Sequence, residues 1–135
     1  MRKFGIMFFA AVLVACGLTH PAMAIKQFSD QFKELYIKHH PNKEFAEYVT
    51  KKVRCFVCHQ GKKKKNHNPY GQHLTELLDR KKDKKNKEKI IAALKQVGAM
   101  HSDPNDEKSP TYAELIAAGK LPGGPLEEVK KEPVK

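Results

Sequence analysis

The residues with the clearest chemical potential are the five from Cys55 to His59, in the order Cys-Phe-Val-Cys-His. Two thiols three positions apart on a helical turn can each add to one vinyl group at the edge of a porphyrin, which forms two thioethers. The histidine that follows directly is then held beneath the iron, where its imidazole can bind axially. This spacing is the attachment signature of c-type haem, and it predicts that Cys55 and Cys58 hold one covalent haem while His59 binds its iron.

Two thiols at this spacing also have other uses. A dithiol–disulfide redox motif is expected in a βαβ context, which the sequence does not show. A structural zinc site needs further Cys or His ligands, usually a pair at regular spacing, and the remaining histidines show no such pairing. An exported protein could also oxidise the pair to a disulfide. The histidine directly after the second cysteine favours haem attachment over these alternatives.

The N-terminal residues have the pattern of a secretory signal peptide. Arg2 and Lys3 precede an apolar stretch over 4–18, and a small-x-small site ends at Ala24. The apolar stretch is shorter than the roughly 20 residues of a membrane-spanning helix. We therefore expect residues 1–24 to be cleaved and the protein to be periplasmic or otherwise exported. The alternative is a lipobox in which Cys16 carries lipid, and only in that case do we expect a membrane anchor.

The sequence resembles the monohaem c-type cytochromes at Cys55, Cys58 and His59, which follow an amphipathic helical pattern. The match is close over the five motif residues and loose over the helical plan. The resemblance implies one haem c, export and one-electron transfer between redox partners, so a carrier rather than an enzyme is expected. Haem attachment takes place on the far side of the bacterial membrane, which agrees with the export signal. Members of the commonest soluble class have a distal methionine late in the chain, before a C-terminal helix.

The sequence leaves the sixth ligand of the iron open. Met100 is the only methionine after residue 24, and it lies where the resemblance places a distal ligand. His73, His39 and His101 are rival ligands, and an open or water-bound site is the third arrangement. Two strong ligands favour electron transfer, whereas an open side permits binding of a small ligand. A haem-based binding or sensing module with an open distal side is therefore the alternative function.

The elements that must position these residues are predicted to be short helices. Apolar residues recur at helical spacing over 25–40, 42–54, 68–78, 86–98 and 109–119, and no convincing run alternates with a period of two. The expected N-caps are Ser29, Asn42, Asn68 and Asn86, the last helix is expected to open at Ser109-Pro110, and the expected stops are Gly98 and Gly119. We expect an all-α fold, a small cytochrome c-like domain of four to five short helices around one covalently bound haem over 25–120. A loosely ordered tail is expected over 121–135.

The chain of 135 residues has a net charge of +11 and a mean hydropathy of −0.63, which excludes a polytopic membrane protein. Removing the leader takes away two cations and no anion, which leaves a net charge of +9. Cations gather at Lys62–Lys65 and over 80–89. We expect them to form a docking rim for an acidic redox partner, the alternative being lysines that only aid solubility. Nucleic acid is not an expected partner, because the protein is expected to be exported and the lysines lack interleaved aromatic residues.

Overall fold

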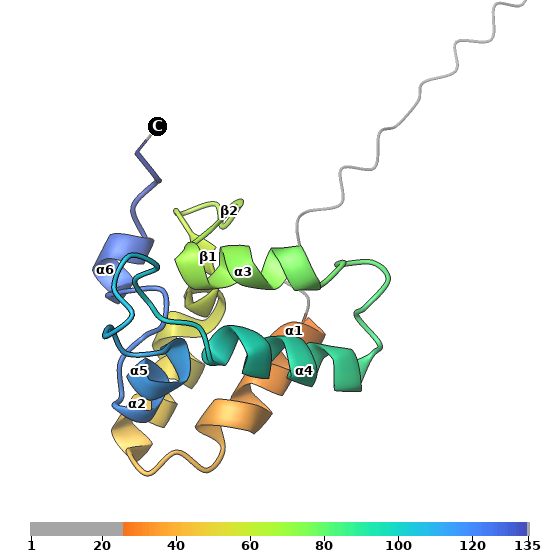
Figure 1. Cartoon of the computed structure of the whole chain (residues 1–135), viewed down its shortest axis with the longest axis horizontal. Coiled ribbons are helices and arrows are strands. Elements are labelled where there is room, and N and C mark those ends of the chain that lie inside the picture. The colour runs from red at the N-terminus through yellow and green to blue at the C-terminus, as the bar shows by residue number, and fades with distance from the viewer. Residues whose placement is uncertain (1–25, 135) are drawn as a thin grey trace, which may run out of the picture.

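The computed structural model describes residues 26–134 (Figure 1). The predicted leader, with Cys16, lies outside the described residues. Within them the chain forms six α-helices, two π-helical stretches, a 3-10 turn and one two-stranded antiparallel sheet. In chain order these are α1 (Lys26–Phe32), η1 (Lys33–Ile37), α2 (Lys43–Tyr48), η2 (Val49–Val53), η3 (Arg54–Val57), β1 (His59–Gln60), β2 (Asn66–His67), α3 (Pro69–Leu77), α4 (Lys87–Gly98), α5 (Tyr112–Ala117) and α6 (Leu126–Val129). The predominantly helical class is confirmed, while periodicity did not predict the small sheet.

Three of the predicted N-caps are confirmed. The side-chain oxygens of Asn42, Asn68 and Asn86 each accept a hydrogen bond from the backbone amide three residues later, at the starts of α2, α3 and α4. The predicted cap at Ser29 is wrong, because α1 already begins at Lys26 and Ser29 lies inside it. The last predicted helix begins later than expected. Its cap is Thr111, which forms a reciprocal capping box with Glu114.

The segment that leads into the cysteine motif is one irregular helical path through α2, η2 and η3. Its buried residues are spaced by four and are Phe45, Val49, Val53 and Val57. In a regular α-helix a four-residue spacing drifts around the helix, because one turn holds 3.6 residues. A π-helical stretch has more residues per turn and so reduces that drift. The irregularity keeps all four side chains in the core and delivers Cys55 to its edge.

The core is organised around α4, which packs against α1, α3 and α5 (Figure 1). Tyr70 of α3 is fully buried, and its ring meets those of Phe32 and Tyr112 edge-on at centroid distances of 6.1 and 5.2 Å. The helix α4 ends at Gly98 as predicted, but for a different reason. A Cβ atom there would come within 2.3 Å of the Tyr36 hydroxyl, so close packing requires the glycine.

The C-terminal segment differs from the loosely ordered tail that was expected. It contains α6, whose Leu126 and Val129 side chains are buried in the common core. The Val129 carbonyl accepts a hydrogen bond of 2.8 Å from the Gly61 amide, which ties α6 to the turn between β1 and β2. The predicted stop at Gly119 is confirmed by its positive φ of 75° after the end of α5. None of the helices over 26–134 is long and apolar enough to cross a membrane.

Candidate functional site

The three residues with predicted chemistry line one cavity of about 220 Å³. Cys55 and Cys58 face it from η3 and the following turn, and His59 faces it from β1. The rest of the wall is mainly apolar and is formed by Phe28, Phe32, Val49, Val57, Leu74, Leu78, Ile90 and Leu94. The cavity is therefore a mainly apolar pocket with two thiols and the imidazoles of His59 and His67 on its wall.

Both cysteines of the described residues are free thiols and partly buried. The Cys58 amide donates a hydrogen bond of 3.3 Å to the Cys55 carbonyl, which closes the turn that brings both side chains to the cavity. Burial raises the pKa of the Cys58 thiol to about 12, and the neighbouring Cys55 raises it further. The Cys58 side chain is therefore a neutral thiol near pH 7, and it can lie against apolar walls without a counter-ion.

His59 pairs with His67 across the two strands. Their rings stack with a centroid distance of 4.6 Å and an interplanar angle of 32°. Burial lowers the pKa of His59, and the nearby His67 lowers it further, which favours the neutral imidazole. The His59 Nδ1 atom is buried, and the described residues offer it no hydrogen-bond partner. A neutral imidazole with an unsatisfied ring nitrogen is suited to bind a metal ion.

Cationic side chains surround the apolar wall of the cavity. They are Lys33, Arg54, Lys64, Lys65 and Arg80, and no carboxylate is found among the described lining residues. Arg54 directly precedes Cys55 and has φ 51° and ψ −116°, a backbone conformation that residues with a Cβ rarely adopt. Strain of this kind gathers at functional sites, where the surrounding structure holds it in place.

None of the four predicted distal ligands is among the residues lining the cavity. Met100 follows the end of α4 and is 37% exposed. His39 and His101 are exposed, and the His101 Nδ1 atom lies 2.6 Å from the Ser109 carbonyl oxygen. His73 lies on α3 with its ring 6.0 Å from that of Tyr112, whereas Leu74 and Leu78 of the same segment face the cavity.

Two residues of the site were not identified as functional from the sequence. His67 lines the cavity, and it is relevant to the site because it pairs with His59 in the small sheet. The polar residues between the two histidines gave no sequence signal for that pairing. Asn68 was predicted only as a helix cap. It is fully buried, and its side-chain amide donates hydrogen bonds of 3.1 and 2.9 Å to the carbonyls of Phe56 and Val57 inside the motif.

The described residues hold no cluster of three or more His, Cys, Asp or Glu side chains placed to bind a metal ion by themselves. The chemistry of the site therefore rests on the two thiols, the imidazoles of His59 and His67 and the apolar wall. Comparison with protein-family models, with curated proteins and with solved structures gave no match.

Proposed function

We propose that this protein is an exported monohaem c-type cytochrome that carries single electrons between redox partners. Cys55 and Cys58 would hold the haem through thioethers, and His59 would bind its iron. The observation that supports the proposal most directly is that all three residues line one apolar cavity. The function is a carrier rather than an enzyme, and attachment of haem c requires the export that the N-terminal pattern predicts.

The residues of the cavity fit a haem in several independent respects. Two free thiols and the His59 imidazole, all three on the cavity wall, match the groups that attachment and ligation need. The apolar wall suits a flat porphyrin, and the exposed cationic residues among the lining, Arg54, Lys64, Lys65 and Arg80, suit its carboxylates. At about 220 Å³ the cavity is smaller than the roughly 300–1,000 Å³ of pockets that enclose a drug-sized ligand. The cavity would therefore not enclose a whole porphyrin, and part of the bound ring would extend beyond it.

When bound, the haem would supply a one-electron iron couple. The residues of this chain have the other tasks. The two thiols would fix the ring, the His59 imidazole would donate a nitrogen ligand, and the apolar side chains would exclude water from the iron. Exclusion of water lowers the local dielectric response and so helps to set the reduction potential.

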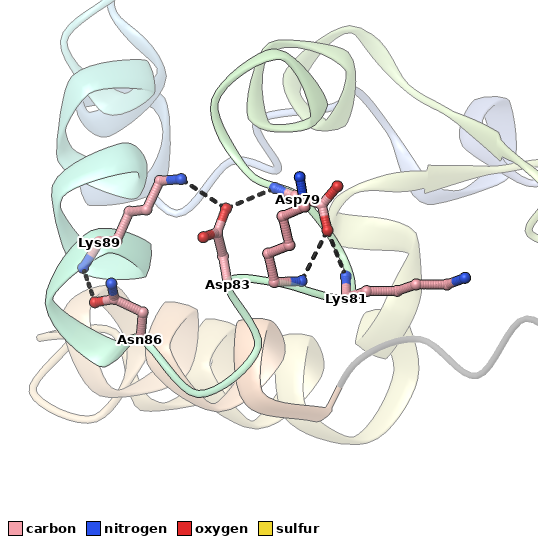
Figure 2. A network of polar contacts seen from close by, with 6 residues as sticks. Asp79, Lys81, Asp83, Asn86 and Lys89 are labelled. Carbon is pink, nitrogen blue, oxygen red and sulfur yellow. Dashed lines mark hydrogen bonds and ion pairs between the residues drawn. The ribbon is translucent and has the colours of Figure 1, made fainter.

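The basic loop between α3 and α4 is evidence for a redox partner with an acidic surface. Both aspartates of the loop are engaged in polar contacts, and Asp83 is buried whereas Asp79 is exposed (Figure 2). The Asp83 carboxylate accepts hydrogen bonds of 2.7 Å from the Asp79 amide and from the Lys89 ammonium group, and Asp79 accepts from the amides of Lys81 and Lys82 at 2.8 Å. The side chains of Arg80, Lys81 and Lys82 are left exposed. A surface of this sign attracts an acidic partner and speeds its encounter.

The test of the proposal is covalent haem content after expression with a haem-maturation system. The protein should keep a haem stain on a denaturing gel, and its mass should equal the polypeptide plus one haem.

Cys55→Ala and Cys58→Ala should each leave little correctly assembled holoprotein, and His59→Asn should change the ferric spectrum. His101→Asn is the matched control, because that histidine is exposed and does not line the cavity. A wild-type mass with two unmodified thiols refutes the proposal.

One observation favours a second function, a haem-based module that binds a small ligand on an open distal side. Met100 and the three rival histidines do not line the cavity, and His67 stacks on His59. An iron with one protein ligand has a free position for a diatomic gas. Carbon monoxide discriminates between the two functions. Rapid stoichiometric binding to the reduced protein at neutral pH would support the module and count against a six-coordinate carrier.

A further inference from the structure

Asn68 joins the cysteine motif to the start of α3. Its side chain is fully buried, and all three of its polar hydrogen-bonding contacts are to backbone groups. The Nδ2 atom donates to the carbonyls of Phe56 and Val57, and the Oδ1 atom accepts from the Gly71 amide at 2.9 Å. The Asn68 amide also donates to the Cys58 carbonyl at 3.0 Å. Asn68 therefore donates hydrogen bonds to three consecutive carbonyl groups of the cysteine motif, those of residues 56, 57 and 58.

The other two asparagine caps show which of these contacts is unusual. Asn42 and Asn86 accept from a backbone amide in the same way as Asn68 does. Of these three caps, only Asn68 has a side-chain amide group that also donates to a different segment in the described structure. The orientation of that amide is determined by its partners. A flipped group would place its oxygen against two carbonyl oxygens and its nitrogen against a backbone donor.

The packing around the Asn68 side chain is close. A Cβ atom at Gly123 would come within 2.0 Å of the Asn68 Nδ2 atom, so the glycine backbone closes one side of the amide. The Gly71 backbone lies against the Cys58 carbonyl on the other side of the same junction. The Asn68 amide thus lies between the Gly123 backbone and the carbonyls of Phe56 and Val57, and the Cys58 carbonyl lies against Gly71.

We infer that Asn68 is a positioning residue, which holds the backbone at 56–58 so that both thiols and the His59 imidazole face the cavity. Without its amide group, the carbonyls of Phe56 and Val57 lose their donors and the turn can rotate away from the cavity wall. The role in haem attachment rests on the proposed function. The control of Cys58 placement does not, because it can be measured in the haem-free protein.

The experiment compares the same substitution at the three asparagine caps. Serine is also a good N-cap, so Asn42→Ser, Asn68→Ser and Asn86→Ser all retain a capping oxygen. Only Asn68→Ser removes the donors to the motif. Asn68→Asp, with Asn86→Asp as its control, is a second pair that keeps the side-chain size and the acceptor.

In the haem-free protein the readout is alkylation of Cys58 by iodoacetamide, measured by mass spectrometry relative to hydrogen exchange of the whole chain. We expect Cys58 of Asn68→Ser to react about tenfold faster than in the wild type, since local opening becomes easier. The two control caps should react at the wild-type rate. Wild-type protection of Cys58 in Asn68→Ser overturns the inference, and so does reactivity that rises only together with global unfolding.

In the haem-loaded protein the readouts are the midpoint potential and the ferric absorption spectrum. Both should shift in Asn68→Ser and stay unchanged in Asn42→Ser and Asn86→Ser. An unchanged potential and spectrum in the loaded Asn68→Ser protein contradict the inference. A wild-type protein that takes up no haem refutes the proposed function, and the alkylation rates then still decide whether Asn68 positions Cys58.

Discussion

The backbone of Gly71, in the first turn of α3, lies directly against the carbonyl group of Cys58. A Cβ atom at position 71 would come within 2.0 Å of that carbonyl oxygen. Such an approach is closer than any side chain permits, so the contact between α3 and the cysteine motif depends on a glycine. The helix therefore serves as a platform on which the second thiol is placed.

Gly71→Ala should destabilise the protein although alanine is the better helix former. A free helical glycine would gain about 0.5–1 kcal/mol on this change. Here the added methyl group must displace the Cys58 carbonyl, and overpacking of this kind costs about 1–3 kcal/mol. Urea denaturation measures the free energy of unfolding, and haem content should fall in parallel. Glu76→Ala, on the exposed side of the same helix, is the control. A Gly71→Ala protein that is more stable than the wild type would show that the Cys58 carbonyl can move away from the added methyl group with little loss of free energy.

Met100→Ala should leave the ferric spectrum of the haem-loaded protein unchanged. Met100 is 37% exposed, and it is absent from the wall of the cavity that holds Cys55, Cys58 and His59. A methionine ligand produces an absorption band near the red edge of the ferric spectrum. Loss of such a band in Met100→Ala would show that the loop after α4 moves to the iron when haem binds.

Asp83→Asn should lower the free energy of unfolding at neutral pH, and it should lower it less in acid. The hydrogen bond from Lys89, followed by that from the Asp79 amide, holds the pKa of Asp83 below its usual value of 3.8 (Figure 2). A lowered pKa means that the folded state binds fewer protons, so this stabilisation is present above about pH 4 and is lost as the pH falls through the folded-state pKa. Urea denaturation at pH 7 and pH 3 should show a difference between wild type and variant that shrinks in acid. Glu76→Gln is the control, and an equal difference at both pH values would contradict the prediction.

Deletion of residues 126–135 should loosen the turn between β1 and β2, in addition to the loss of stability expected from removing the buried Leu126 and Val129. The Gly61 amide donates to the Val129 carbonyl, and the Lys62 amide donates to a Glu132 carboxylate oxygen at 3.1 Å. Without these acceptors, amide hydrogen exchange at Gly61 and Lys62 should rise about tenfold or more. Glu132→Gln should have a smaller effect confined to Lys62.

The matched control for this deletion is Glu127→Gln. Glu127 lies on α6 but pairs with Lys130 of the same segment rather than with the turn. Unchanged exchange at Gly61 after the deletion would mean that the strand pairing of His59 with His67 is sufficient to order the turn.

Charge reversal in the basic loop should slow electron exchange with anionic reactants. Lys81 and Lys82 are exposed, and the nearby aspartates are engaged with backbone amides or Lys89. The oxidation rate with ferricyanide should fall about tenfold in the double variant with Lys81→Glu and Lys82→Glu, and the wild-type rate should fall with ionic strength. Reversal of Lys38 and Lys51, which are paired with Glu34 and Glu47, is the control. Equal rates in both double variants would mean that the loop does not steer the reactant.

The sequence by itself determined the local features of this protein. The Cys-x-x-Cys-His spacing and the asparagine caps of α2, α3 and α4 depend on residues at most four positions apart, so their chemistry is visible in the chain. The same holds for the apolar residues Phe45, Val49 and Val53, because helical periodicity is a local property. Ser29 was misplaced as a cap because a serine near the start of an apolar pattern does not distinguish the cap from the first turn.

Only the tertiary structure decided what surrounds the motif. The pairing of His59 with His67, the donation from Asn68 to the motif and the docking of α6 on Gly61 each depend on which surfaces meet. The position of Met100 outside the cavity depends on how α4 packs, since residues far apart in sequence line that cavity. Such contacts form because buried polar groups need hydrogen-bond partners and apolar faces must be covered. Neither requirement specifies which residues, distant in sequence, will supply the contact.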